Sequence, residues 1–424
     1  MNVVNNISKH EKLIAVIKYL LTFLKWLFIA TLTGVFTGLV GTLFNKTISY
    51  VTDFRGSHDF IIWFLPVGGL AIVLAYKLSR VDVDAGTNMV LSSVRKHEKV
   101  HPMLAPLIFI AASITHLFGG SAGREGAALQ LGGGIGFQVG RLFRLDDSDK
   151  GTIVICGMAG LFSALFGTPI TAVLFAMEVI SVGVFYYSAF IPAIITSLSS
   201  YVITLRFGIK PERFELKGVP DLTTFPILKV ILLATAIAVL SIVFVVSLEG
   251  SHKLLKKLFK NPYIRIFAGG CAIVGLTFIL GTRDYNGAGM NIVEHALHGE
   301  AEPFAFALKL IFTCITIGAG FKGGEIVPTF FIGATFGCVF GDLIGLNPAF
   351  GAAIGLIAMF CGVVNCPVAS IILSIELFSD ANSIVFFTLA CGISYVLSGY
   401  YGLYSSQKIV YSKLKHEYIN INAK

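Results

Sequence analysis

Residues 157–180 read GMAGLFSALFGTPITAVLFAMEVI, and residues 355–378 read GLIAMFCGVVNCPVASIILSIELF. Both stretches contain a proline that is followed nine positions later by a glutamate, and these glutamates are Glu178 and Glu376. A chain that resembles itself at a fixed offset, here about 200 residues, is built from two copies of one unit. The equivalent positions of the two glutamates predict a shared structural task, such as helix capping or an inter-helix hydrogen bond.

Two further matches lie upstream at a similar offset. Gly123-Arg124-Glu125-Gly126 matches Gly323-Gly324-Glu325-Ile326, and residues 84–89 (DAGTNM) match residues 286–290 (NGAGM). Because these features recur in the same order, composition bias does not explain them. The repeat therefore organises most of the chain.

The composition is that of a polytopic membrane protein. Of the 424 residues, 55% are hydrophobic and only 13% are charged, and the mean hydropathy is +0.82. These values exclude an ordinary soluble domain. Many apolar stretches contain Gly or Pro, or are shorter than the ~20 residues of a straight membrane span, so we expect tilted, broken and re-entrant helices. The stretches are 13–43, 60–78, 103–118, 153–181, 184–205, 225–248, 263–281, 304–320, 326–345, 350–378 and 383–400.

We predict one transmembrane domain that spans residues 1–424, with a first half at about 30–205 and a second half at about 225–404. Only about twenty residues follow the last apolar stretch, so no C-terminal soluble regulatory domain is expected. Repeats of this kind form an ion site at their interface from the ends of broken helices. The number of apolar stretches leaves parallel and inverted topologies open.

The net charge of +8 describes membrane topology and does not indicate nucleic-acid binding. The basic residues fall in a few loops and at the chain ends, which the positive-inside rule places in the cytoplasm together with both termini. No cleavable signal is evident, because the first apolar stretch is too long for one. The basic residues are Lys9 and Lys12, the run Lys77, Arg80, Arg95, Lys96 and Lys99, the run Lys253, Lys256, Lys257, Lys260 and Arg265, and the tail Lys408, Lys413 and Lys415.

The seven cysteines lie inside apolar stretches, without metal-ligand spacing and without a histidine nearby. We interpret them as small packing residues and predict neither a metal site nor a cofactor. They are Cys156, Cys271, Cys314, Cys338, Cys361, Cys366 and Cys391.

Glu125 carries the strongest functional signal, because it stands at the start of an apolar stretch from Ala127 to Val139. A carboxylate at membrane depth is costly and by default marks an ion or proton pathway. The flanking glycines expose backbone N–H groups, and free N–H groups at a helix start bind anions. We expect the carboxylate to occupy an anion site and to leave it when protonated, which would couple anion and proton movement. The alternative is a local ion pair with Arg124.

Glu325 supplies a second carboxyl group at the equivalent point of the second half. Pro328 suits the first turn of a helix that continues through residues 329–333. Two neighbouring carboxylates resist simultaneous ionisation, so we expect one to be protonated and able to donate a hydrogen bond to a small anion. The alternative is an ion pair with Lys322 at the membrane surface.

A competing pattern is Gly119-Gly120-Ser121-Ala122-Gly123, which fits the G-x-S-x-G signature of a hydrolase nucleophile, with His116 close in sequence. That signature requires a β-strand before the serine. Residues 104–118 instead form an apolar, helix-like stretch. A secondary transporter is therefore favoured over an enzyme.

Several of these motifs together resemble the CLC family of chloride channels and anion/proton antiporters. The resemblance covers essentially the whole chain and implies an all-α CLC-type fold of two inverted repeats with tilted, broken and re-entrant helices. It also implies a homodimer with one anion pathway per subunit. The motifs are GREGAALQLGGGIG (123–136), GGEIVPTFFIGATFG (323–337), both proline-to-glutamate helices and Gly402-Leu403-Tyr404-Ser405.

The resemblance also implies roles for single residues. Glu125 resembles the family's gating glutamate, and Tyr404 resembles the tyrosine whose hydroxyl closes the central site from the cytoplasm. Thr87, Asn88 and Met89 form the first anion loop, and the sequence does not decide which of them faces the ion. The backbone amides that resemble the anion cradle are those of Arg124, Gly126, Glu325, Ile326 and Val327.

The departures from the family pattern point to fluoride. Chloride-type members usually have G-S-G-I-P where this chain has GTNMV at residues 86–90, and a proline where it has Ala127. Their third loop usually carries no acid, whereas Glu325 stands here, as in the fluoride-exporting branch. Proton-coupled chloride exchangers have a second acid directly after the position of Glu178, and this chain has Val179.

The leading prediction is a fluoride/proton antiporter of the cell membrane that exports fluoride as protons move inward through Glu125 and Glu325. Fluoride is small and strongly hydrated, so a site rich in hydrogen-bond donors could replace its lost water. Its partners would be a small inorganic anion, protons and the lipid bilayer. One alternative, favoured by Thr87 and Tyr404, is a chloride/proton exchanger. The other is a passive anion channel.

Overall fold

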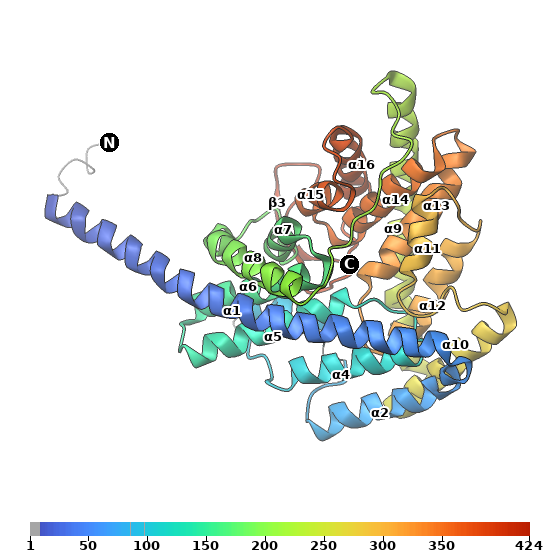
Figure 1. Cartoon of the computed structure of the whole chain (residues 1–424), viewed down its shortest axis with the longest axis horizontal. Coiled ribbons are helices and arrows are strands. Elements are labelled where there is room, and N and C mark those ends of the chain that lie inside the picture. The colour runs from blue at the N-terminus through green and yellow to red at the C-terminus, as the bar shows by residue number, and fades with distance from the viewer. Residues whose placement is uncertain (1–8, 85, 97) are drawn as a thin grey trace.

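The protein is described from a computed structural model that covers residues 9–84, 86–96 and 98–424. Ala85, in the matched segment 84–89, lies outside the described residues, as do residues 1–8 and the side chain of Lys9. The described residues form sixteen α-helices, two short 3-10 helices and one small sheet (Figure 1). The α-helical prediction is confirmed.

The helices of the first half run from α1 to α8, and those of the second half run from α9 to α16. The first set is α1 Lys9–Ser57, α2 Leu65–Leu78, α3 Thr87–Lys96, α4 Leu104–Leu117, α5 Glu125–Leu142, α6 Asp147–Phe166, α7 Pro169–Glu178 and α8 Phe190–Arg206. The second set is α9 Thr224–Leu258, α10 Pro262–Leu280, α11 Met290–Leu297, α12 Ala305–Ala319, α13 Ile326–Leu343, α14 Pro348–Val364, α15 Pro367–Phe378 and α16 Ile384–Leu397.

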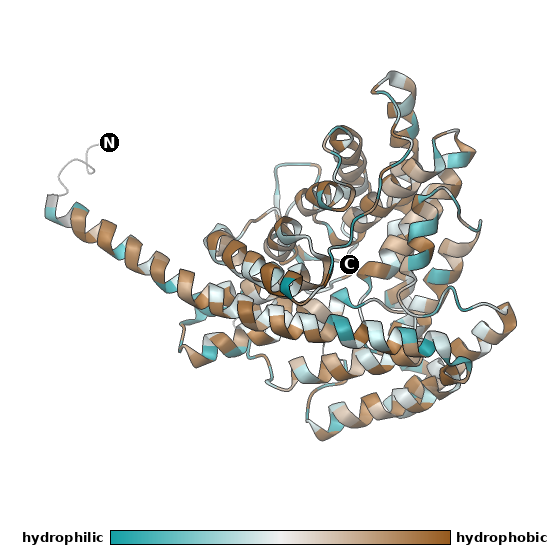
Figure 2. Ribbon diagram, viewed as in Figure 1, coloured by the Kyte–Doolittle hydropathy of each residue, from teal (hydrophilic) through white to brown (hydrophobic). Residues whose placement is uncertain are grey.

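The lengths of these helices confirm that many do not cross a bilayer straight. Among the described residues, seven helices are long and apolar enough to span a membrane, and six shorter apolar helices accompany them. Figure 2 shows apolar residues along the outer helices, including the length of α1. In α1, Leu20, Leu21 and Phe23 are exposed, as expected for lipid-facing side chains.

Two predicted stretches, 153–181 and 350–378, each contain two helices and not one. The first breaks at Gly167 (φ 70°) and the second at Asn365 (φ 57°), both in the left-handed region that ends a helix. The proline that follows two positions later starts the next helix. Hydropathy could not place these breaks, because both sides of each are apolar.

The centre of the molecule consists of α6 and α14, whose residues are buried along almost their whole lengths. Each packs closely on the preceding long helix through glycine. A Cβ on Gly132 of α5 would overlap the carbonyl oxygen of Gly157 in α6, and one on Gly333 of α13 would overlap that of Gly355 in α14. Small residues thus allow these helices to approach closely.

Glu178 and Glu376 cap each other's helices across the two halves. Glu178, at the end of α7, accepts hydrogen bonds from the N–H groups of Val368 (3.3 Å) and Ala369 (2.9 Å) in the first turn of α15. Glu376, in α15, accepts from Ile170 (3.0 Å) and Thr171 (2.7 Å) in the first turn of α7. The predicted structural role of both glutamates is confirmed. The two helices run antiparallel, as equivalent helices of inverted repeats do.

Replacing Glu178 with alanine is expected to lower the thermal midpoint in detergent, because two first-turn N–H groups of α15 would lose their acceptor. A hydrogen bond to a charged group contributes about 1.5–3 kcal/mol, so a loss of roughly 2 kcal/mol or more is expected. Glu178→Gln, which keeps one acceptor oxygen, should be milder. The control is Glu294→Ala, on the exposed side of α11. Equal midpoints for the two alanine variants would contradict the capping role.

A small sheet ties the C-terminal segment to the first half. Strand β1 (Ser181–Val182) follows α7 and pairs in parallel with β2 (Lys408–Tyr411), which pairs antiparallel with β3 (Tyr418–Asn422). This pairing fixes the segment between α16 and β2, which contains Tyr404.

Candidate anion and proton site

The two glutamate-bearing loops meet in the middle of the molecule. Gly123 and Gly324 form an antiparallel bridge, with N···O distances of 2.7 Å and 2.6 Å. Directly after the bridge, α5 begins at Glu125, and Glu325 is the N-cap of α13. A Cβ on Gly324 would overlap the backbone nitrogen of Gly126, so this approach requires glycine. The N-termini of two equivalent helices therefore converge, which favours an anion.

Glu125 is sealed inside this meeting point. Its side chain is 0% exposed, and neither carboxylate oxygen has a hydrogen-bond partner within the described protein. The Nε atom of Arg124 lies 3.4 Å from its Oε1 atom, so the alternative of a local ion pair describes a real contact. The same guanidinium also donates through Nη2 to Glu212, which sequence reasoning did not single out. The carboxylate is thus buried and only partly compensated.

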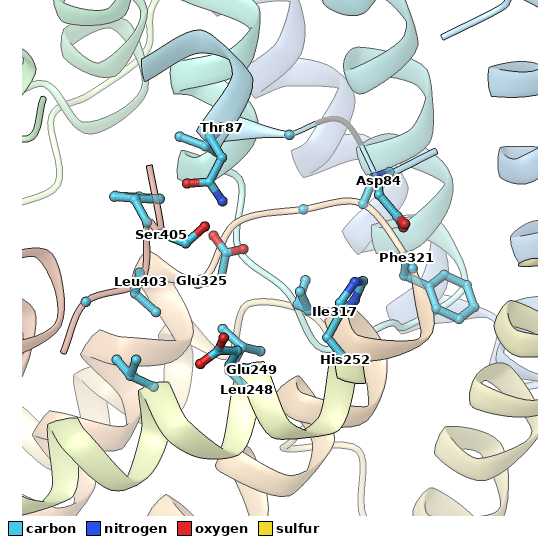
Figure 3. A pocket seen from close by; sticks show the side chains of 18 of the residues that line it. Asp84, Thr87, Leu248, Glu249, His252, Ile317, Phe321, Glu325, Leu403 and Ser405 are labelled. Atoms are coloured by element: carbon cyan, nitrogen blue, oxygen red, sulfur yellow. The ribbon is translucent and has the colours of Figure 1, made fainter. Parts of the chain in front are cut away.

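Glu325 differs from Glu125 because it reaches a cavity. The cavity has a volume of about 370 Å³, and we call it the Glu325 cavity (Figure 3). The Oε2 atom of Glu325 is buried and has no hydrogen-bond partner among the described residues, and a Cβ on Gly126 would lie 3.0 Å from it. The ammonium group of Lys322 donates to the carbonyl of Val83 and lies 5.0 Å from the ring centre of Tyr76. Glu325 therefore lies on a cavity wall near the start of α5.

The first anion loop forms another part of the wall of the Glu325 cavity. Thr87 and Asn88 line the cavity, whereas Met89 packs on the hydrophobic core. The Thr87 hydroxyl donates to the carbonyl of Gly126 (3.3 Å) and accepts from Nε2 of Gln130 (3.2 Å). The question that the sequence left open is thus answered for the cavity, which Thr87 and Asn88 face and Met89 does not.

Tyr404 also borders the Glu325 cavity, and its hydroxyl is buried and has no hydrogen-bond partner in the part of the chain that the structure describes. The loop that carries it is held at several points. Ser406 donates through its backbone N–H and through its hydroxyl to Oδ1 of Asn88, each at 3.0 Å. Gln407 donates through Nε2 to the carbonyls of Val179 and Val364, each at 2.9 Å. The loop therefore holds the tyrosine in place, and the hydroxyl group can still donate a hydrogen bond to a small anion.

The remaining residues of the predicted cradle lie at the helix starts but do not line the cavity. Arg124 is the N-cap of α5, and Gly126 lies in the first turn of that helix. Ile326 and Val327 begin α13 and are buried. The two carboxylates of the site therefore differ, because Glu325 lines the cavity and Glu125 is fully buried and does not line it.

Charged side chains surround the mouth of the Glu325 cavity. Glu249 and His252 project into it from α9 (Figure 3), and Lys253 also lines it. Asp84 forms ion pairs with Lys256 (2.7 Å) and Arg265 (3.0 Å). Burial would raise the pKa of Asp84, but the hydrogen bond from Lys256 and the charge of Arg265 outweigh it and hold that pKa below its ordinary value. The segment that follows α2 therefore lies beside the end of α9 and the start of α10.

Sequence reasoning missed Gln130, Glu212, Glu249 and His252. Gln130 is a polar residue within an apolar stretch, and that signal could have revealed it. The other three lie in polar surroundings in the sequence, where a solvated side chain is the default interpretation.

The hydrolase alternative finds no support in the geometry. The residues before Ser121 form α4 and a short loop, and not the strand that a nucleophile elbow requires. The hydroxyl of Ser121 lies 3.1 Å from that of Thr313, and the backbone carbonyl of His116 accepts from Arg55.

Six of the seven cysteines are buried, and Cys271 is exposed on α10.

The chain is similar to known anion channels and transporters over most of its length. The family described as "Voltage gated chloride channel" matches residues 68–399. A chloride/fluoride channel protein of Pseudomonas syringae pv. tomato is 32% identical over 396 residues, which is 92% of this chain and 87% of that protein. An H(+)/Cl(-) exchange transporter of Salmonella typhi is 26% identical over 413 residues, covering 90% of this chain and 87% of the relative. The crystal structure of a CLC-type fluoride/proton antiporter superposes with a TM-score of 0.87 at 31% identity, covering 95% of this chain and 99% of that one.

Proposed function

Because the chain belongs to the voltage-gated chloride channel (CLC) family, we propose that this multi-pass membrane protein exports fluoride in exchange for protons. The observation that carries the proposal is the place of Glu325. An acid stands on the cavity wall beside the start of α5, where chloride-type members usually have none. The similarity to a fluoride/proton antiporter of known structure supports the same choice of ion.

In this proposal fluoride binds between the starts of α5 and α13. The first N–H groups of each helix have no intrahelical acceptor and carry the positive end of the helix dipole. At the cavity side, Tyr404 adds a hydroxyl group. The Thr87 hydroxyl becomes a second donor when it releases the carbonyl of Gly126. A protonated Glu325 adds one more donor, which helps replace the water that fluoride loses.

Glu125 acts as the gate, because its carboxylate competes with the anion for the same N–H groups. A proton that arrives from outside neutralises Glu125 and releases it from the site, so fluoride can pass outward. Glu325 is in contact with the cavity, so it can pass its proton to cavity water without the internal acid that Val179 replaces. Each carboxylate thus handles the proton on one side of the bound anion.

We further propose that the protein works as a homodimer in the cell membrane, with both termini in the cytoplasm. The dimer follows from membership in the family. The orientation follows from the positive-inside rule, because Lys253 and Lys424 line the cavity and Lys256 and Arg265 lie beside its mouth. The whole chain would form one transport domain of two repeats.

The test is ion efflux from liposomes that contain the purified protein, read with fluoride and chloride electrodes while external pH is followed. We expect fluoride to leave at least about tenfold faster than chloride and protons to enter in step with it, because the donors suit fluoride. Fast chloride efflux without a pH change would refute the proposal.

The second candidate is a chloride/proton exchanger. Thr87 and Tyr404 support it, because hydroxyl groups at these positions also suit chloride, and one relative is named as such an exchanger. The same assay separates the two, since an exchanger of this kind would move chloride and protons together. A passive channel would move either anion with no proton flux.

A further inference from the structure

Arg124 connects the buried gate to a second, more exposed carboxylate. Its Nε atom lies 3.4 Å from Oε1 of Glu125, and its Nη2 atom forms an ion pair with Oε1 of Glu212. The three side chains are exposed to different degrees, 0% for Glu125, 16% for Arg124 and 21% for Glu212. One guanidinium is therefore shared between a fully buried carboxylate and a more exposed one.

The position of Glu212 is fixed by the segment that joins the two halves, residues 207–223. Its N–H donates to the carbonyl of Phe166, at the end of α6, at 3.1 Å. Two residues later, the N–H of Phe214 donates to the carbonyl of Leu377, in α15, at 2.8 Å. Pro211 packs against Gly167, where a Cβ would overlap it. The segment is thus tied to both halves, and the carboxylate of Glu212 is held where it meets Arg124.

We propose that Glu212 is a positioning residue for the gate, which divides the charge of Arg124 between two carboxylates and so sets the pH at which the gate opens. The inference rests on the proposed function of Glu125. If Arg124 faced Glu125 alone, its full charge would stabilise the ionised gate in place. Sharing the guanidinium with Glu212 weakens that attraction and lets Glu125 accept a proton at higher pH.

Other charged and titratable groups near the gate come from several elements. The imidazole of His116, in α4, is buried near the backbone of Gly123 and interacts with the charge of Arg124. The remaining groups make their contacts elsewhere. Glu325 lies before α13 and faces the cavity. Arg55 of α1 donates to the carbonyl of His116, at the end of α4. Lys309 of α12 donates to the carbonyls of Tyr285 (3.2 Å) and Gly287 (2.7 Å). Tyr404 lines the cavity. Within the described residues, the ion pairs of Arg124 are those with Glu125 and Glu212.

The test is the pH dependence of fluoride efflux from liposomes for the full-length protein. Glu212→Gln should shift the midpoint to lower pH by roughly half a unit to one unit, because the ionised gate is better compensated. Arg124→Gln should shift it to higher pH, because the compensating charge is gone. Glu212→Asp should restore most of the wild-type midpoint. If the ion pair were merely structural, the two substitutions would not shift the midpoint in opposite directions.

Glu215→Gln is the matched control, because Glu215 lies in the same segment, is 76% exposed and pairs with Lys217 at 3.4 Å. Its midpoint should equal that of the wild type. The inference is overturned if Glu212→Gln behaves like Glu215→Gln, or if Glu212→Gln and Arg124→Gln shift the midpoint in the same direction. A wild-type protein that moved fluoride without protons would instead refute the proposed function. The two failures are therefore distinguishable.

Discussion

Glutamine at position 125 is expected to lower the proton flux that accompanies fluoride efflux by at least about tenfold. Glutamine has the shape of the native side chain but cannot ionise, so it can neither compete as an anion nor carry a proton. The native carboxylate is fully buried, has no hydrogen-bond partner within the described protein and is compensated only by the ion pair with Arg124. Any fluoride efflux that remains should no longer depend on pH.

The matched control for this experiment is Glu178→Gln. Glu178 is also a buried glutamate of the first half, but its carboxylate caps α15. Its replacement should affect stability and leave proton coupling intact. The gate assignment would be wrong if Glu125→Gln kept coupled transport at the wild-type ratio.

The repeat explains how much of the fold could be predicted from the sequence. The matched glutamates Glu178 and Glu376 and the matched loops predicted equivalent helices and a central meeting point. The structure confirms both, with reciprocal caps and a bridge between Gly123 and Gly324. Such pairs can be predicted because, when two halves are related by two-fold symmetry, each of two matched residues makes the same contact with the other half.

What could not be predicted depends on contacts between positions that no repeat relates. Glu212 meets Arg124 across 88 residues of chain, and its polar neighbours in the sequence suggest only a solvated loop. The short helices α3 and α11 are neither long nor uniformly apolar, so hydropathy does not reveal them. The side of α3 that faces the cavity is set by packing on α5 and α6, and not by the residues of the loop.

The two halves are related in backbone but not in chemistry, and that difference bears on mechanism. Glu125 and Glu325 occupy equivalent places at the helix starts, yet one is sealed and the other touches a cavity. A carboxylate that exchanges protons with cavity water can stay in protonation equilibrium with one side of the membrane. A sealed carboxylate can do so only after it moves. This asymmetry supports our proposal that Glu325 handles the proton on the cavity side of the bound anion.

Replacing Glu325 with glutamine should therefore separate anion binding from proton transfer. The amide keeps a donor on the cavity wall, so fluoride affinity measured by calorimetry should stay within about threefold of the wild type, while coupled proton flux falls at least about tenfold. Glu325→Ala removes the donor as well and should weaken fluoride binding by about tenfold to a hundredfold, since one hydrogen bond to a charged ligand contributes about 1.5–3 kcal/mol. The control is Glu249→Gln, which removes another carboxylate of the same cavity, on α9. Its coupled proton flux should equal that of the wild type if proton transfer requires Glu325 in particular. If Glu325→Gln transported protons as the wild type does, Glu325 could only be a selectivity residue, and the proton would have to leave Glu125 by another route.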